Sequence, residues 1–94
     1  MRSKFKPKFW RDINKVKGDK ELMVALYRVF LNVENAETVS GINNIKQLVK
    51  FKSRYRIKLS LDKKRNYRIG LYIHGSMVWF ARLLHRSKIY DDNW

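Results

Sequence analysis

The hydrophobic pattern of this 94-residue chain changes once, from a helical period to a strand period. From Pro7 to about Asn35, apolar residues recur every three or four positions, as they do along one face of an α-helix. From Tyr55 to Leu84 they largely alternate with other residues, as they do in strands. Helices followed by strands predict an α+β fold, because neither kind of element can bury its apolar face alone.

The helical part is expected to form a hairpin of two helices. Pro7 suits the first position of a helix, where its missing N–H costs nothing. We expect Gly18 to end this helix as a left-handed cap and Asp19 to cap the second helix. The buried stripe of the second helix is Leu22, Leu26, Val29 or Phe30, and Val33. A DNA-reading helix-turn-helix is the alternative, but its second helix would carry only Lys20 and Arg28 as basic residues.

Three strands are expected after an irregular stretch over residues 36–47. The first two cover residues 55–61 and 67–73, and each alternates regularly between its two faces. The third covers residues 77–84 and is apolar on both faces, which is typical of a central strand. A short helix or turn over residues 86–93 should then cross the edge of the sheet.

One face of the expected sheet is open and positive. It collects Arg56, Lys58 and Arg68 from the first two strands, together with Val78, Phe80, Arg82 and Leu84 from the third. Both helices are expected to pack on the opposite face of this small, twisted, antiparallel sheet. Residues 1–94 are enough for one such domain with one modest core.

The charge of the chain is strongly basic and unevenly distributed. There are 22 Lys and Arg residues against 8 Asp and Glu, for a net charge of +14. From Lys46 to Lys88 there are 13 basic residues and one acid, Asp62. A domain of this kind attracts polyanions, so the C-terminal half predicts a nucleic-acid partner.

Composition also excludes several classes of site. The chain has no cysteine, so it has neither a disulfide framework nor a thiolate metal site. With two histidines and no acidic cluster at ligand spacing, we expect no metal and no cofactor. The apolar runs are too short to span a bilayer, and no apolar segment follows the basic N-terminus as in a signal peptide. We therefore expect a cytoplasmic protein without a membrane partner.

The segment from His85 to Tyr90 carries the side chains best suited to chemistry on RNA. Histidine moves a proton near neutral pH, since its ordinary pKa is about 6.5. Arg86 suits contact with the backbone phosphates, and Tyr90 suits base stacking or proton transfer. His85 could instead only close a strand end, and Tyr90 could be a plain edge aromatic. Trp94 is expected to be mobile and dispensable.

Several fragments resemble the RelE and HigB toxins of bacterial toxin–antitoxin systems. They are residues 55–59 (YRIKL), 66–70 (NYRIG) and 85–90 (HRSKIY), supported by residues 5–9 (FKPKF) and 42–48 (INNIKQL). The resemblance covers nearly the whole chain. It implies a RelE-like fold and a ribonuclease that cuts messenger RNA in the ribosomal decoding site, held silent by a cognate antitoxin.

The resemblance also implies roles for individual residues. Arg56, Lys58 and Arg68 would clamp the scissile phosphate, and His85 would transfer protons while the ribose 2′-OH attacks the phosphorus. Lys58, Arg68 and Tyr90 would share in catalysis, with the choice of base and acid left open. Arg82 and Arg86 would bind the RNA backbone. The chain departs from the best-studied RelE members, which have lysine where it has Arg56 and arginine where it has Leu84.

Two other functions are compatible with the same sequence. The related ParE branch shares the fold but poisons DNA gyrase, so the fold alone does not decide between them. A plain basic RNA-binding module would bind in a salt-dependent way and cut nothing. For the antitoxin, an acidic and partly disordered segment would suit the positive face with its expected exposed aromatics, Tyr72 and Phe80. It would act by covering the cations or by pulling away the segment from His85 to Tyr90.

Overall fold

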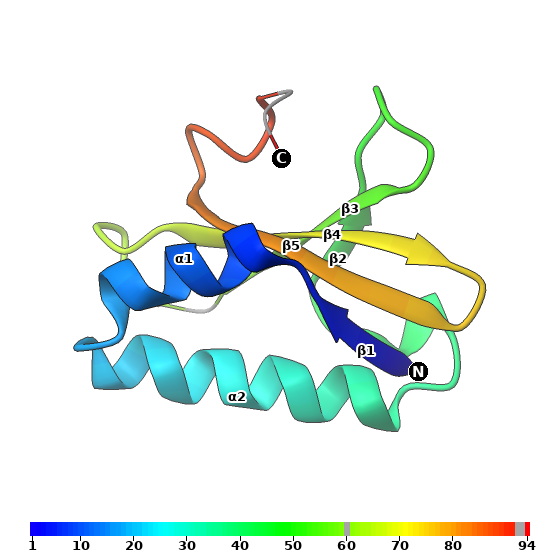
Figure 1. The fold of residues 1–94 in the computed structure, drawn as a ribbon, viewed down its shortest axis with the longest axis horizontal. Coiled ribbons are helices and arrows are strands. Elements are labelled where there is room, and N and C mark those ends of the chain that lie inside the picture. The colour runs from blue at the N-terminus through cyan, green and yellow to red at the C-terminus, as the bar shows by residue number, and fades with distance from the viewer. Residues whose placement is uncertain (60, 92–93) are drawn as a thin grey trace.

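The computed structural model describes residues 1–59, 61–91 and 94 as a mixed α+β fold built around one sheet (Figure 1). The elements in chain order are β1 (Arg2–Phe5), α1 (Pro7–Val16), α2 (Lys20–Asn35), the 3-10 turn η1 (Val39–Gly41), β2 (Ile45–Gln47), β3 (Arg54–Lys58), β4 (Tyr67–His74) and β5 (Met77–His85). The α+β class predicted from the sequence is therefore confirmed. Neither α-helix has the length and apolar character needed to cross a bilayer within the described residues.

The sheet has five strands in the order β1-β5-β4-β3-β2, two more than the sequence predicted. β1 runs parallel to β5, with Arg2 opposite Met77 and Phe5 opposite Phe80. The other neighbouring strands are antiparallel. The expectation of a purely antiparallel sheet is thus wrong at β1, where the chain leaves the sheet edge directly into α1.

The helices begin and end close to the expected residues. Pro7 is the first residue of α1, and the Asp19 side chain caps α2 by accepting a hydrogen bond from the Leu22 amide over 3.1 Å. The expected left-handed cap at Gly18 is wrong, because Gly18 does not have a positive φ and the C-cap residue of α1, Lys17, is right-handed. Among the described glycines, positive φ occurs at Gly75, which forms the tight turn between β4 and β5.

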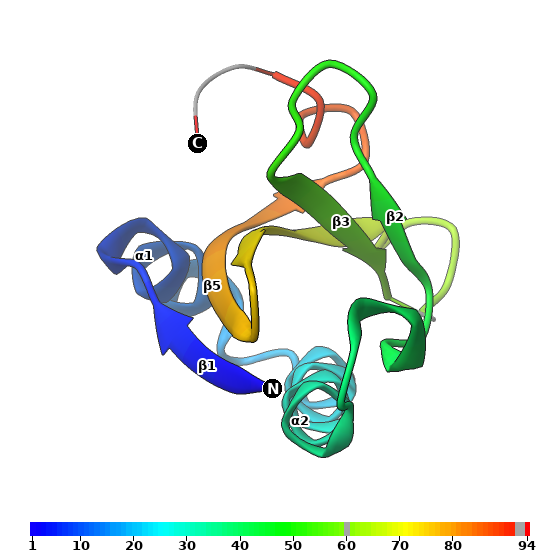
Figure 2. The same ribbon diagram turned by 90° about the vertical axis from the view of Figure 1, so that its right-hand side faces the viewer.

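The core lies between α2 and the sheet face that α2 covers (Figure 2). Its fully buried members are Phe9, Leu22, Val33, Ile57, Ile69, Leu71, Val78 and Phe80. An aromatic cluster closes one end, where the ring of Phe5 stacks on that of Phe80 at 5.1 Å and Phe30 meets Phe80 edge-on. Burial of these rings fixes β1 and α1 against β5.

β5 contains an irregularity that reverses the alternation of its side chains. Gly70 pairs with Arg82 and Leu71 pairs with Phe80, so Ala81 is an extra residue that pairs with no residue of β4. Such a bulge moves the following residues to the other face. Val78 and Phe80 were expected on the open face, but both are fully buried in the core.

α1 lies along the edge of β5 instead of beside α2 under the sheet (Figures 1 and 2). β1 covers β5 only as far as Phe80, and α1 covers the edge beyond it. There the buried Asp12 carboxylate accepts a hydrogen bond from the Leu83 amide over 2.9 Å and from Arg82 Nε over 2.7 Å. The expected packing of both helices on one face is therefore not found, because Asp12 acts as the hydrogen-bonding partner of an uncovered strand edge.

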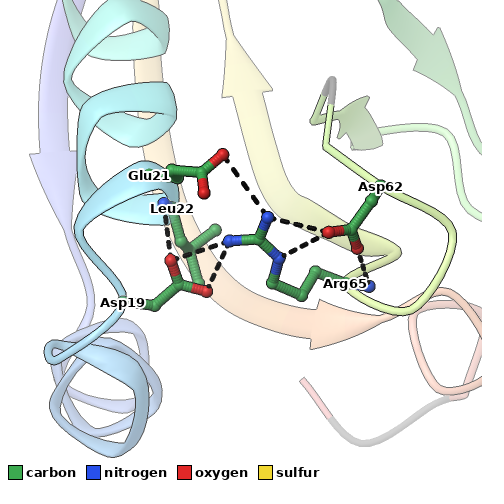
Figure 3. Close-up of polar contacts among 5 residues, drawn as sticks. All are labelled: Asp19, Glu21, Leu22, Asp62 and Arg65. Atoms are coloured by element: carbon green, nitrogen blue, oxygen red, sulfur yellow. Dashed lines mark hydrogen bonds and ion pairs between the residues drawn. The ribbon is translucent and has the colours of Figure 1, made fainter.

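A cluster around Arg65 joins the start of α2 to the turn before β4 (Figure 3). Arg65 donates to Asp62 over 2.8 Å and to Asp19 over 2.9 Å, and it lies 3.4 Å from Glu21. These hydrogen bonds lower the pKa of Asp19 and Asp62 and raise the pKa of Arg65. The cluster thereby holds in place the turn that leads through Asn66 into β4.

Replacement of Asp12 tests the edge contact. Removing one partner of a buried ion pair leaves the other charge uncompensated, so we expect Asp12→Ala to lower the free energy of unfolding by about 3 kcal/mol. Urea unfolding followed by far-UV circular dichroism measures this change. Glu37→Ala, which removes an exposed carboxylate, is the matched control and should be nearly neutral. Equal stability of the two variants would contradict the role given to Asp12.

The Arg65 cluster predicts a particular dependence of stability on pH. Because the pKa values of Asp19 and Asp62 are lowered by folding, their contribution is complete above about pH 4 and is lost as the pH falls through the lower folded values. Arg65→Met should lower the urea midpoint at pH 7, and its difference from wild type should shrink towards pH 2. Lys63→Met, in the same turn but exposed, should show no such convergence. A difference that stays constant across the range would rule out this account.

Candidate nucleic-acid-binding site

The cations predicted to hold phosphate stand in cross-strand rows on the sheet face opposite α2. Each row takes one residue from β3, β4 and β5, and the three rows are Arg54–Tyr72–Trp79, Arg56–Gly70–Arg82 and Lys58–Arg68–Leu84. The structure therefore brings Arg56, Lys58, Arg68 and Arg82 onto one face. We refer to these three rows as the open face.

Arg68 is the most unusual residue of the open face because it is a buried cation. It is 7% exposed, and its Nη1 donates to the Asn66 side-chain oxygen over 2.6 Å. Its Nε is buried without a hydrogen-bond partner. Buried polar groups are almost always hydrogen-bonded, so a buried guanidinium nitrogen without an acceptor indicates a donor that a bound ligand could satisfy.

The neighbours of Arg68 also lack a negative partner. Arg56 donates from Nη1 to the Asn44 carbonyl over 2.8 Å, and its Nε is buried without a partner. Lys58 is exposed beside Arg68. Among the described residues, no carboxylate forms an ion pair with any of these three cations. Such a group repels itself and is stabilised by an anion such as a phosphate.

Arg82 belongs to the open face but is engaged elsewhere. Its Nε and Nη2 bind the two carboxylate oxygens of Asp12, over 2.7 and 3.2 Å, and its side chain is 17% exposed. Arg82 therefore joins α1 to β5. The expected role in phosphate binding does not fit this arrangement.

His85 is exposed at the end of β5, opposite Tyr67 of β4. Its ring contacts the Tyr67 ring at 6.2 Å, and its Nδ1 accepts a hydrogen bond from the Ser87 amide over 3.3 Å. Because Nδ1 is an acceptor, the neutral ring carries its proton on Nε2, which is the nitrogen left for a substrate.

The structure does not bring His85 into contact with the phosphate-binding cations. His85 and Tyr67 form the pair next to Leu84 and Arg68, which lie on the open face. Because successive side chains in a strand point to opposite faces, the side chains of His85 and Tyr67 leave their strands on the other face. In the described part of the chain, the His85 ring contacts Tyr67 and Ser87, not Arg68 or Lys58. No described hydrogen bond or ring contact thus joins the imidazole to these cations, and their convergence stays a prediction.

The segment after β5 forms a turn over residues 86–91. Its anchor is Ile89, which is fully buried, and the Arg86 amide donates to the Asn66 carbonyl over 2.8 Å. Tyr90 is 54% exposed and lines a groove of about 260 Å³ together with residues 46–51. The Arg86 side chain is exposed. Residues 92 and 93 of the expected terminal helix or turn lie outside the described residues.

Trp94 and Gly70 are the site residues that sequence reasoning missed. Trp94 was expected to be dispensable, yet its indole lies on Gly70 in the middle row of the open face and donates from Nε1 to the Ile89 carbonyl over 3.1 Å. The signal available in the sequence was the glycine itself, since a glycine inside a strand often marks the close approach of another group.

The described residues contain no cluster of three or more histidine or acidic side chains that could hold a metal ion. What the open face offers is a set of guanidinium and ammonium groups bordered by aromatic rings. Arginine and lysine bind phosphate, and aromatic rings stack on bases. The arrangement is suited to a single strand of nucleic acid.

Comparison with known proteins shows the family to which the chain belongs. No family profile matches the chain. The chain is 30% identical over 95 residues to the toxin RelE3 of Methanocaldococcus jannaschii, and the match covers 97% of each protein.

Solved structures show the same fold. One chain of the RelB–RelE antitoxin–toxin complex from Methanococcus jannaschii superposes with a TM-score of 0.74 at 26% identity, over 94% of this chain and 95% of that one. YafQ from Escherichia coli BL21(DE3) superposes with a TM-score of 0.69 at 14% identity, over 97% of this chain and all of that one. At 14% identity the second likeness concerns the fold alone. From its similarity to RelE3 along almost its whole length, the chain belongs to the RelE family of toxins.

Proposed function

We propose that this protein is the toxin of a toxin–antitoxin pair and that it cuts messenger RNA on the ribosome, in the cytoplasm, without a metal ion. The observation that carries the proposal is the buried Arg68, whose Nε lacks a partner, next to Lys58 and Arg56; none of these three cations is paired with a carboxylate among the described residues. A phosphodiester would supply the missing acceptors. RNA rather than DNA is the substrate, because cleavage without a metal uses the ribose 2′-OH.

The proposed reaction is an internal transfer at phosphorus. The 2′-oxygen attacks the adjacent phosphorus, the bond from phosphorus to the 5′-oxygen breaks, and a cyclic 2′,3′-phosphate and a 5′-OH are formed. A base takes the 2′ proton, and an acid returns a proton to the leaving 5′-oxygen. Arg68, Lys58 and Arg56 stabilise the charge that develops on the phosphoryl oxygens.

His85 is the group proposed for proton transfer, with Tyr90 as a stacking or second proton-transfer group. His85 follows Leu84, whose Cα is about 3.8 Å away and which stands in the same row as Arg68. A nucleotide bound at the end of β5 would therefore contact both the imidazole and the row that contains Arg68. Movement of the exposed ring away from Tyr67 would present Nε2 to the substrate.

The proposed partner is an antitoxin, as in the RelB–RelE and DinJ–YafQ complexes. The outer face of α2 supports this, because Val24, Tyr27 and Leu31 are 51%, 61% and 40% exposed and lie in one stripe. The buried Phe80 does not take part, contrary to expectation. An acidic segment of the antitoxin would cover Lys58 and Arg68 or would displace the segment that begins at His85.

Substitution of the site residues tests the nuclease. In a purified translation system, wild-type protein should cut the translated message, as read by primer extension. We expect His85→Ala and Arg68→Ala to lower the cleavage rate by about 100-fold each, since proton transfer and charge stabilisation contribute at least that much. Lys63→Ala, an exposed cation outside the open face, is the control and should cut normally.

Other outcomes would redirect the assignment. An intact message in the presence of folded wild-type protein and active ribosomes would count against the nuclease. DNA breaks that depend on gyrase, with the message intact, would favour a ParE-like poison instead. Binding of RNA without cleavage or growth arrest would leave a basic RNA-binding module.

The salt dependence of RNA binding tests the phosphate contacts separately from catalysis. Each phosphate contact to a single strand adds about −0.7 to the slope of log K against log salt concentration. We expect Lys58→Ala to weaken binding of a fluorescein-labelled RNA in fluorescence anisotropy and to make the slope shallower by about 0.7. Lys15→Ala on α1 should change neither quantity. An unchanged slope for Lys58→Ala would remove Lys58 from the phosphate contacts.

A further inference from the structure

The middle row of the open face holds an aromatic ring that comes from the far end of the chain. Trp94 lies over Gly70, between the rows of Arg54 and of Lys58. A Cβ added to Gly70 would stand 2.7 Å from Cη2 and Cζ2 of the indole. The absence of a side chain at this one position therefore creates a shallow seat in the sheet, and a flat ring fills it.

The walls of this seat have the chemistry of a base-stacking site. The Tyr72 ring meets the indole edge-on at 5.4 Å, and the Arg54 guanidinium lies 4.8 Å from the indole centroid. Edge-on aromatic contact and a cation over the ring stabilise any electron-rich planar ring and are not specific to tryptophan. Nucleobases stack on the same groups.

The polar contact of the ring has an equivalent in a nucleobase. The indole Nε1–H donates to the Ile89 carbonyl over 3.1 Å. The exocyclic amino group of a purine is an N–H donor at the edge of a two-ring system of similar size. In the row of Gly70, the neighbouring residue on β3 is Arg56, a cation placed to hold the phosphate attached to such a base.

We propose that the seat over Gly70 is a purine-binding site for single-stranded RNA and that Trp94 occupies it when RNA is absent. This inference rests on the proposed RNA-cutting function, for which the seat would bind a base next to the phosphate held by Arg68. Trp94 competes with that base. Its departure also frees the Ile89 carbonyl and the open face above Arg56.

The test is a binding experiment with a hexaadenylate that carries fluorescein and 2′-O-methyl groups, which prevent attack by the 2′-oxygen. We expect Trp94→Ala to bind this RNA about tenfold more tightly than wild type, because a stacked base is worth roughly this factor or more. Adding Gly70→Ala to Trp94→Ala should cancel the gain, since the methyl group fills the seat. Adding Gly18→Ala, where a Cβ meets nothing within 4 Å, should leave the gain intact.

Three results of the affinity measurements would overturn the inference. They are equal affinity of Trp94→Ala and wild type, weaker binding by Trp94→Ala, and a gain in affinity that survives Gly70→Ala. Amide NMR spectra of each variant check that the fold is kept. In wild type, the Trp94 indole N–H peak, assigned by its loss in Trp94→Phe, should shift on saturation with RNA while that of Trp10 does not. An unshifted Trp94 peak would also overturn the inference.

Cleavage of a translated message by wild type, measured in parallel, separates this inference from the proposed function. Normal cleavage together with an unchanged affinity of Trp94→Ala would refute the seat and leave the nuclease in place. The expected pattern of affinities without any cleavage would support the seat on a protein that binds RNA but does not cut it.

Discussion

The extra residue at Ala81 determines how β5 supplies side chains both to the core and to the open face. Before it, Val78 and Phe80 point into the core, and after it Arg82 returns to the open face without exposing Leu83. Asp12 acts at the same place, because its carboxylate binds the Leu83 amide and the Arg82 guanidinium together. Because β1 pairs with β5 only as far as Phe80, the edge of β5 beyond it is uncovered, and a buried acceptor from α1 binds there. The position of α1, and of the aromatic cluster that packs on it, follows from this contact.

The distribution of acidic side chains separates structural cations from those available to a substrate. Arg65 has Asp19, Asp62 and Glu21 around it, and Arg82 has Asp12. Arg56 and Arg68 instead have only neutral oxygens of asparagine residues as described side-chain partners. A buried charge with neutral partners is less stable than a paired one, and proteins tolerate this mainly where a ligand completes the set. Arg56, Lys58 and Arg68 therefore keep an unbalanced positive charge on the open face, because no described carboxylate is paired with them.

The period of the apolar residues predicted the helices and strands that bury one face. It did not predict elements whose position depends on hydrogen bonds or on pairing with another strand. Both α-helices and the strands β3, β4 and β5 were predicted to within a few residues, because each carries a regular apolar stripe. β1 was missed because it is short, basic and paired on one side only, so its stability comes from β5 and not from its own sequence. The bulge at Ala81 has no local sequence signal. The pairing of Asp12 with Arg82 spans 70 positions and needs the fold to be known.

The position of Trp94 over Gly70 bears on why His85 makes no described contact with Arg68. Trp94 is bound to the Ile89 carbonyl, and Ile89 belongs to the same turn that begins just after His85. The ring seated over Gly70 therefore restrains the segment that carries His85 and Tyr90. A base that replaced Trp94 would remove this restraint at the moment when the phosphate reaches Arg68. The lack of a described contact between the imidazole and the cations would then belong to the form in which Trp94 lies over Gly70, and coupling of base binding to release of the turn would confine the complete site to the RNA-bound form.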